Sequence, residues 1–300
     1  MTLCHLHHHH RPHITSSHIK DLKSMVSWQV LDYENHPFKN YSIEQLKRML
    51  GLRRPEDYIP RQINFESLNT SLPDSFDSRQ QWPNCVHPIR DQGQCGSCWA
   101  FAASEVLSDR FCIKTNGNTN VVLSPQDLVS CDHSDFGCQG GMLDSSWKYL
   151  VNTGIVSDEC LPYSSGDGSS AECPNAGNCK SGIWRKFKAS TFNQFNSIEE
   201  IKQSIFIDGP VEAGFDVYDD FFSYSGGIYV RSSDNLVGGH AVKTIGWGVE
   251  NGIEYWIVAN SWATKWGENG YFRIKFRECN IDSEMIAGIP DTSVINKLLK

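Results

Sequence analysis

The chain has no run of about 20 consecutive apolar residues, the length that a helix needs to cross a bilayer. It also has no excess of positive charge, because 27 lysines and arginines are outnumbered by 35 aspartates and glutamates. Nucleic acid binding requires a concentrated basic face. We therefore expect neither a membrane nor a nucleic acid among the partners of this 300-residue protein.

The N-terminal end lacks the apolar stretch that opens secreted precursors, since it reads MTLCHLHHHHR. We interpret residues 1–17, with the histidine run His7–His10, as an unstructured end without a role in a site. Cysteine is abundant instead, with eleven residues, ten of them beyond Leu72. A reducing cytosol rarely supports so many, so the sequence predicts disulfides and an oxidising compartment, and the excess of acidic residues suits an acidic or extracellular one.

Hydrophobic periodicity divides the chain near Leu72. The lysine-rich stretch from Ile19 to Leu52 has a helical period, with Ser42 as the predicted cap. Further helices are predicted from Ser97, as N-cap, to Phe111 and on both sides of a Cys-Gly stretch between Ser124 and Val151. Later runs such as VEAGFDVY, HAVKTIGWGV, EYWIVANSW and GYFRIKF read as strands. This order predicts an α+β fold whose helical and strand-rich lobes enclose a cleft.

Only three histidines follow Leu72, so a histidine general base beyond that point must be one of them. His87 and His133 lie in predicted polar loops, and we interpret both as surface residues. His240 follows two glycines and opens an apolar strand, where the orientation of an imidazole can be fixed. His240 is therefore the candidate base, and the alternative is a histidine satisfied in the core.

The candidate nucleophile is Cys98, in the sequence QGQCGSCW. A glycine turn leads directly into the predicted helix, whose dipole favours a thiolate in its first turn. With His240 nearby, a thiolate–imidazolium pair would attack a carbonyl and protonate the leaving amine. The alternatives are a structural disulfide or a redox pair with Cys95. A redox pair is disfavoured because such pairs lie in a thioredoxin-like βαβ unit, whereas the predicted strands of this chain come long after Cys98.

A structural zinc site is a further alternative for the cysteines. Its ligands would be Cys131, Cys138, Cys173 and Cys179. The irregular spacing of these cysteines, without paired Cys-x-x-Cys motifs, disfavours such a site. We expect no metal and no other cofactor.

Three more residues complete the predicted site. Asn260 follows an apolar run and can orient the imidazole, while Trp262 shields that hydrogen bond from water. Gln92 precedes the nucleophile by six residues and can donate to a tetrahedral oxyanion, together with the Cys98 backbone N–H.

These residues lie in motifs that resemble the papain-like cysteine peptidases, in the order CGSCW, GGHAV and NSWATKWGENGYF. The segments SFDSRQQWPNC, IRDQGQCGSCWAFAASEVLSDR, GWGVENG and SEMIAGIP are similar to cathepsin B in particular. Upstream, SWQ at Ser27–Gln29 and the MLG sequence resemble the short cathepsin B propeptide. The resemblance covers nearly all of the chain from Leu72 to Pro290.

The resemblance implies a proenzyme: a helical inhibitory propeptide over residues 18–71 and a papain-like peptidase domain over residues 72–300. The domain would comprise a mainly helical lobe (72–182) and a mainly β, barrel-like lobe (183–300). The propeptide would run backwards through the cleft and block it until acid releases it. Expected partners are protein and peptide substrates, the chain's own propeptide and cystatin-like inhibitors, with the protein as a monomer.

The resemblance also assigns residues. Peptide substrates would lie against Gly140, Gly141, Gly239 and Trp262, since glycine permits close backbone approach. Glu284 would lie at the base of the main specificity pocket and accept arginine, although it can also be read as a surface acid. Four disulfides are implied, which leave Cys98 and Cys279 free: Cys85–Cys112, Cys95–Cys138, Cys131–Cys173 and Cys160–Cys179.

The chain departs from cathepsin B in one stretch, LPYSSGDGSSAECPNAGNC, which contains no histidine. Cathepsin B carries a His-His occluding loop there, which captures the substrate carboxylate during removal of C-terminal dipeptides. We therefore expect a cysteine endopeptidase, made as a zymogen for protein degradation in an acidic compartment, with weak or absent dipeptidyl-carboxypeptidase activity. The alternative is an inactive papain-like homologue that acts as a binding module.

Overall fold

The computed structural model describes residues 11–66 and 71–293. The histidine run His7–His10 and residues 67–70 of the expected propeptide lie outside the described residues. The expectation of an unstructured end over residues 1–17 is wrong for its last residues, because a helix begins at Ser16. Thr15 caps this helix by accepting a hydrogen bond from the backbone N–H of His18, and Ile14 is buried.

The helices within the described ranges are α1 (Ser16–Met25), α2 (Ile43–Lys47), α3 (Ser78–Gln81), α4 (Cys98–Lys114), α5 (Pro125–Cys131), α6 (Leu143–Asn152) and α7 (Ile198–Asp208). Short 3₁₀ turns are η1 (Tyr33–Asn35), η2 (Gly137–Gln139), η3 (Asp219–Ser223) and η4 (Glu278–Asn280). The strands are β1 (Gln29–Val30), β2 (Phe76–Asp77), β3 (Ala189–Gln194), β4 (Val211–Tyr218), β5 (Tyr224–Gly226), β6 (Ile228–Tyr229), β7 (Leu236–Glu250), β8 (Ile253–Ala259), β9 (Tyr271–Lys275) and β10 (Glu284–Pro290). None of these helices is long and apolar enough to span a bilayer.

The main sheet has eight strands in the order β3-β10-β4-β7-β8-β9-β6, and β2 pairs with the far half of β7. All pairings are antiparallel except that of β6 with β9. Among the described residues no pairing joins β3 to β6, so this barrel-like lobe is an open, curved sheet and not a closed barrel. The α+β class is as expected, and helices precede most of the strands, but α7 lies between β3 and β4 and was not predicted.

Helix α4 is the centre of the molecule. Fifteen of its residues are buried, from Cys98 to Cys112, because it is covered on all sides and contacts β7, β10, α5 and α6. An all-round buried surface distinguishes such a helix from an amphipathic surface helix. Ser97 is its N-cap residue but does not cap it, contrary to the prediction. The Ser97 hydroxyl instead contacts the hydroxyl of Tyr163 at 3.0 Å.

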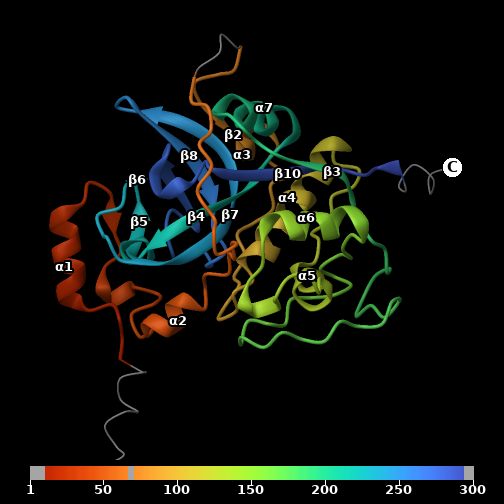
Figure 1. Cartoon of the computed structure of the whole chain (residues 1–300), viewed down its shortest axis with the longest axis horizontal. Coiled ribbons are helices and arrows are strands. Elements are labelled where there is room, and N and C mark those ends of the chain that lie inside the picture. Colours follow the sequence, from red (N-terminus) through yellow and green to blue (C-terminus); the bar gives the residue numbers. More distant parts are fainter. Residues whose placement is uncertain (1–10, 67–70, 294–300) are drawn as a thin grey trace, which may run out of the picture.

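Residues 14–66, here called the N-terminal segment, begin beside β5 and β6 and end beside α7, where Asn64 bridges to Ser197 (Figure 1). The orange part of the trace passes between the sheet and the helices α5 and α6. Helix α2 is held by the predicted cap, since Ser42 forms a capping box with Gln45. Strand β1 pairs with β5, and Trp28 packs its ring against Tyr224 and Tyr229. The segment thus contributes to the apolar core of the whole chain.

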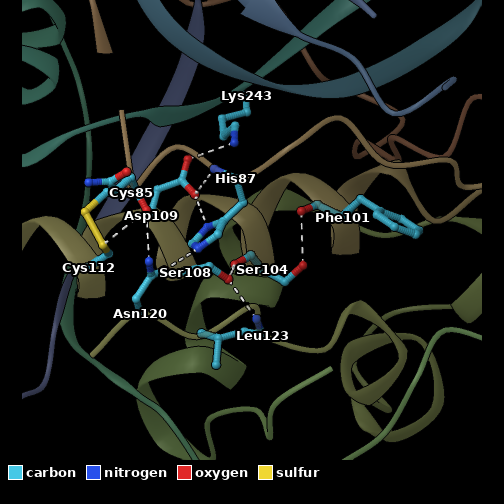
Figure 2. A network of polar contacts seen from close by, with 11 residues as sticks. Cys85, His87, Phe101, Ser104, Ser108, Asp109, Cys112, Asn120, Leu123 and Lys243 are labelled. Atoms are coloured by element: carbon cyan, nitrogen blue, oxygen red, sulfur yellow. Dashed lines mark hydrogen bonds and ion pairs between the residues drawn. A yellow bond between two sulfur atoms is a disulfide. The ribbon is translucent and has the colours of Figure 1, made fainter. Parts of the chain in front are cut away.

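A buried network of polar side chains joins α4 to the sheet (Figure 2). Asp109 of α4 forms an ion pair with Lys243 of β7 at 2.8 Å, and both side chains are inaccessible to solvent. The other oxygen of Asp109 bonds to His87 at 2.6 Å, and His87 also contacts Asn120. The prediction that His87 is a surface residue is therefore wrong, whereas His133 is exposed. Burial lowers the pKa of His87, but Asp109 outweighs this and raises it overall.

We expect Lys243→Met to lower the free energy of unfolding by about 2–3 kcal/mol, because Asp109 loses a buried charged partner but keeps His87. Lys23→Met is the matched control, since the Lys23–Asp32 pair is exposed and its loss should cost less than about 1 kcal/mol. Urea denaturation of the full chain with Cys98→Ala, which prevents self-cleavage, measures both. Equal effects of the two changes would contradict a stabilising role for the buried pair.

Four disulfides are present, and they are the pairs that the resemblance implied: Cys85–Cys112, Cys95–Cys138, Cys131–Cys173 and Cys160–Cys179. The zinc alternative is wrong, because all four of its cysteines are in these bridges. The redox alternative is wrong as well, since Cys95 is bonded to Cys138. In the part of the chain that the structure describes, the unbridged cysteines are Cys98 and Cys279, both buried.

Candidate active site

Cys98 is the first residue of α4, where the unpaired backbone N–H groups of a helix point toward its N-terminus. Its Sγ accepts a hydrogen bond from the backbone N–H of Gly51 at 3.1 Å and a longer one from Ala241 at 3.4 Å. Ala241 follows His240 directly in β7, so the sulfur lies beside the strand that carries the imidazole. The fold thus brings the predicted nucleophile of one lobe to the predicted base of the other.

The orientation of His240 is fixed by Asn260. Nε2 of the imidazole lies 2.7 Å from Oδ1 of Asn260, and the same oxygen accepts the backbone N–H of Ser261 at 2.8 Å. Because Oδ1 can only accept, Nε2 carries the proton and Nδ1 has a free lone pair. Nδ1 is buried and has no hydrogen-bond partner among the described residues. The ring of Trp262 covers the imidazole, with centroids 4.8 Å apart.

Gln92 is fully buried, and hydrogen bonds hold both ends of its side-chain amide. Ser261 donates its hydroxyl to Oε1 of Gln92 at 2.6 Å, which fixes the amide so that Nε2 points toward the cleft. Nε2 donates to the carbonyl oxygens of Cys95 and Met49, both at 2.9 Å. Met49 belongs to the N-terminal segment, so a carbonyl group of this segment accepts the donor that was predicted to bind an oxyanion.

Burial favours the neutral forms of both reacting groups in this covered state. It raises the pKa of the Cys98 thiol to about 12, against the opposing hydrogen bonds from Ala241 and Gly51. It lowers the pKa of His240 to about 4, although Asn260 acts in the opposite direction. A neutral thiol is a poor nucleophile, so the covered geometry is unreactive.

The N-terminal segment crosses the cleft as an extended chain. The Gly141 N–H donates to the Gly51 carbonyl at 2.9 Å, and the Arg53 N–H donates to the Gly141 carbonyl at 2.8 Å. The resulting bridge is parallel, and Leu52 also pairs with Gly239 on the opposite wall. Close approach requires glycine at position 51, because a Cβ there would lie 2.0 Å from the Gly96 carbonyl oxygen.

The remaining predicted residues lie around the same segment. Gly140 has a φ of 110° and a Cβ on it would lie 2.8 Å from the Gly51 carbonyl oxygen. Trp262 contacts Phe38 of the segment edge-on, with centroids 5.7 Å apart. Glu284 is not a free surface acid, because its carboxylate is paired with Arg54 at 3.1 Å.

Two residues of the site, Asp216 and Ser261, were not predicted. Arg54 also bonds to Asp216 of β4 at 2.6 Å, so a second carboxylate lies beside Glu284. The available signal was the alternation of VEAGFDVY, which puts Asp216 on the same face of the strand as Gly214. Ser261 orients the Gln92 amide, but no sequence pattern marked it as a site residue other than its position after Asn260.

The arrangement brings a sulfur nucleophile, an oriented base and the fixed amide donor of Gln92 to one cleft, and acyl transfer requires groups of these kinds. Comparison with known proteins agrees with this chemistry. Residues 72–289 match the model of the papain family cysteine proteases.

Named relatives extend the similarity to nearly the whole chain. A cathepsin B-like cysteine proteinase 4 of Caenorhabditis elegans is 39% identical over 291 residues, which are 84% of this chain and 86% of the relative. Cathepsin B of Dictyostelium discoideum is 39% identical over 277 residues, 87% of this chain and 88% of the relative.

Solved structures of proforms are similar as well. Procathepsin B S9 of Trypanosoma congolense matches with a TM-score of 0.83 at 33% identity, over 94% of this chain and all of that chain. Procathepsin L 3 of Tenebrio molitor matches with a TM-score of 0.71 at 26% identity, over 91% of this chain and 87% of that chain. Either match covers more than nine-tenths of the chain, so the similarity to these proforms extends into the N-terminal segment.

Proposed function

Because the chain belongs to the papain family of cysteine proteases and is cathepsin B-like, we propose that it is the zymogen of an endopeptidase with Cys98 as nucleophile. The observation that carries the proposal is the convergence of Cys98, His240 and Gln92 under a chain segment that occupies their cleft. The rest of the site follows from the chemistry of these groups.

In the uncovered enzyme, Nδ1 of His240 takes the proton of Cys98, and the helix dipole of α4 favours the thiolate. The sulfur attacks the peptide carbonyl, and the oxyanion binds Nε2 of Gln92 and the Cys98 backbone N–H. The imidazolium then gives its proton to the leaving amine, which leaves a thioester. Water, activated by His240, hydrolyses the thioester and restores the thiol.

Residues 18–71 act as the inhibitory propeptide in this proposal. The Met49 carbonyl takes the oxyanion donor and the Gly51 N–H caps the sulfur, so no substrate carbonyl can approach. The parallel pairing with Gly141 gives the segment a fixed direction through the cleft. Release of the segment removes the burial that keeps the thiol and the imidazole neutral.

His36 makes this release dependent on pH. Its Nδ1 accepts the backbone N–H of Phe38 at 3.0 Å and its Nε2 contacts the Ser223 hydroxyl at 3.0 Å. Burial lowers the pKa of His36 from 6.5 to about 4. The released segment therefore takes up a proton at a higher pH than the bound one, and as pH falls from 6.5 to 4 binding should weaken by up to about tenfold per pH unit.

We expect His36→Asn to remove this part of the pH dependence, because asparagine can accept the Phe38 N–H but does not titrate. The initial rate of Cys98 labelling by an epoxide inhibitor, in the full chain between pH 4 and 7, measures the open fraction. His18→Asn, a partly exposed histidine of α1, is the control. A pH profile that His36→Asn leaves as steep as in the parent protein would exclude His36 as a contributor.

An open cleft is the second part of the proposal. The segment from Pro162 to Gly182 contains no helix or strand and no histidine. Near the cleft it offers Asp167, whose negative charge would repel a substrate carboxylate. We therefore propose internal cleavage of proteins in an acidic lysosomal, vacuolar or extracellular compartment, by a monomer open to cystatin-like inhibitors.

The test compares two peptides, one blocked at both ends and one with a free C-terminus, on acid-matured protein. Cleavage of the blocked peptide alone is the expected result for an open-cleft endopeptidase. Release of C-terminal dipeptides would contradict the open cleft. Absence of any cysteine-dependent turnover would instead favour an inactive homologue that serves as a binding module.

A further inference from the structure

Two carboxylates lie side by side at the edge of the cleft, on adjacent strands. Glu284 of β10 pairs in register with Gly214 of β4, and Asp216 follows two residues later on the same face. Asp216 in turn pairs with Gly239 of β7, the residue next to His240. The sheet therefore fixes both acids close to the proposed catalytic residues.

Arg54 of the N-terminal segment occupies the space between these acids. Its Nη1 donates to Asp216 at 2.6 Å and its Nε donates to Glu284 at 3.1 Å. The guanidinium also stacks on Tyr58, 4.6 Å from the ring centroid. About a fifth or less of each of the three charged side chains is exposed, at 15% for Arg54, 19% for Asp216 and 14% for Glu284. Arg54 thus shows which chemical group the pair of acids fits.

The two acids are held in place without Arg54. The second oxygen of Asp216 accepts from Nδ2 of Asn280 at 2.8 Å, which sets the rotation of the carboxylate. Glu284 lies in a strand between β3 and β4. In the described residues, Arg54 is the only cation paired with either acid. When the segment leaves, two partly buried carboxylates remain without a counter-charge, which is a costly state until another cation binds.

We propose that Asp216 is a specificity-determining residue, which acts together with Glu284 to bind the guanidinium of a substrate arginine. This inference rests on the proposed peptidase function, and it adds Asp216 to the acceptance of arginine that the resemblance already implies for Glu284. A guanidinium presents several N–H donors in a fixed plane, so it can contact both acids at once, as Arg54 does. A lysine ammonium is a single point charge on a flexible stem and cannot reproduce this geometry. The site should therefore prefer arginine over lysine.

The test uses the full chain, folded and then matured in acid, with active sites counted by epoxide titration. Blocked reporter peptides X-Arg carry arginine, lysine, citrulline or leucine as X, the second residue before the cleaved bond. Citrulline is nearly isosteric with arginine but uncharged. The variants are Asp216→Asn, Glu284→Gln and the double change. Asp234→Asn is the control, because this fully exposed acid gives the same change in net charge.

We expect the parent enzyme to cleave the arginine peptide with the highest kcat/KM. Asp216→Asn should lower the arginine-to-leucine ratio of kcat/KM by roughly tenfold to a hundredfold, as does loss of a hydrogen bond to a charged group, and should narrow the gap between arginine and citrulline. Asp234→Asn should leave the ratio unchanged. If Asp216→Asn matures poorly, Asp216→Ser provides a second variant for measuring the same ratio. Variants that mature to different extents can be compared, because each kcat/KM is normalised to the titrated active sites.

Two outcomes are distinguishable. An unchanged arginine-to-leucine ratio in the Asp216 variants, with all peptides cleaved, would overturn the role of Asp216 and leave the peptidase function intact. A parent protein that cleaves none of the four peptides would overturn the proposed function itself.

Discussion

Replacement of Cys98 by alanine should lower kcat/KM for a blocked peptide by at least about 10⁴-fold, since removal of the nucleophile from a covalent mechanism leaves only binding and the oxyanion donors. Cys98 lies at the start of α4, and the neighbouring Cys95 is bridged, so no other thiol is available there as a nucleophile. Mass spectrometry should find one epoxide adduct on the acid-matured parent protein and none on Cys98→Ala.

Cys279→Ala is the matched control, because Cys279 is the other unbridged cysteine of the described residues and lies buried within η4. It should keep its activity and its single adduct. Activity that survives in Cys98→Ala, or that disappears only in Cys279→Ala, would contradict the assignment of the nucleophile.

Gly51→Ala should open the zymogen. A Cβ on residue 51 would lie 2.0 Å from the carbonyl oxygen of Gly96, and 2.4 Å from its carbon, so the backbone of the segment must move. We expect a loss of about 3 kcal/mol or more in binding of the segment, which is roughly a hundredfold in the open fraction. The rate of epoxide labelling of the full chain at neutral pH, before any processing, measures this change.

Gly166→Ala provides a glycine control outside the N-terminal segment, since a Cβ on it would have its nearest contact at an ordinary 3.8 Å from the Tyr163 ring. It should label as slowly as the parent zymogen. If Gly51→Ala labelled at the parent rate, the close passage of the segment over Cys98 would not be what blocks the site.

The fold was largely predictable where local pattern and tertiary environment agree. Strands with alternating or continuous β-branched residues, such as Val211–Tyr218, were located by their sequence, and so was the capped turn at Ser42. Whether the sheet closes into a barrel was not predictable, because closure depends on whether the two edge strands, β3 and β6, pair with each other. The cap at Ser97 was mispredicted because a tertiary contact to Tyr163 takes its hydroxyl.

The candidate site was predictable for residues that stand in compact motifs, and less so for residues that matter through their partners. Cys98, His240, Asn260 and Gln92 are together in the structure, as their motifs suggested. His87 was mistaken for a surface residue because Asp109, its partner, is 22 positions away. Asp216 was missed for the same reason: only the pairing of β4 with β7 and β10 brings it to the cleft.

The aromatic contacts of the N-terminal segment allow its release to be followed by intrinsic tryptophan fluorescence. Trp28 lies against two tyrosines, and Trp262 lies against Phe38 while remaining 3% exposed. Departure of the segment transfers the first indole to water and uncovers one face of the second. Tryptophan emission should therefore shift to longer wavelength as the segment leaves, even in the Cys98→Ala protein. Release can thus be followed in real time without substrate, separately from chemistry.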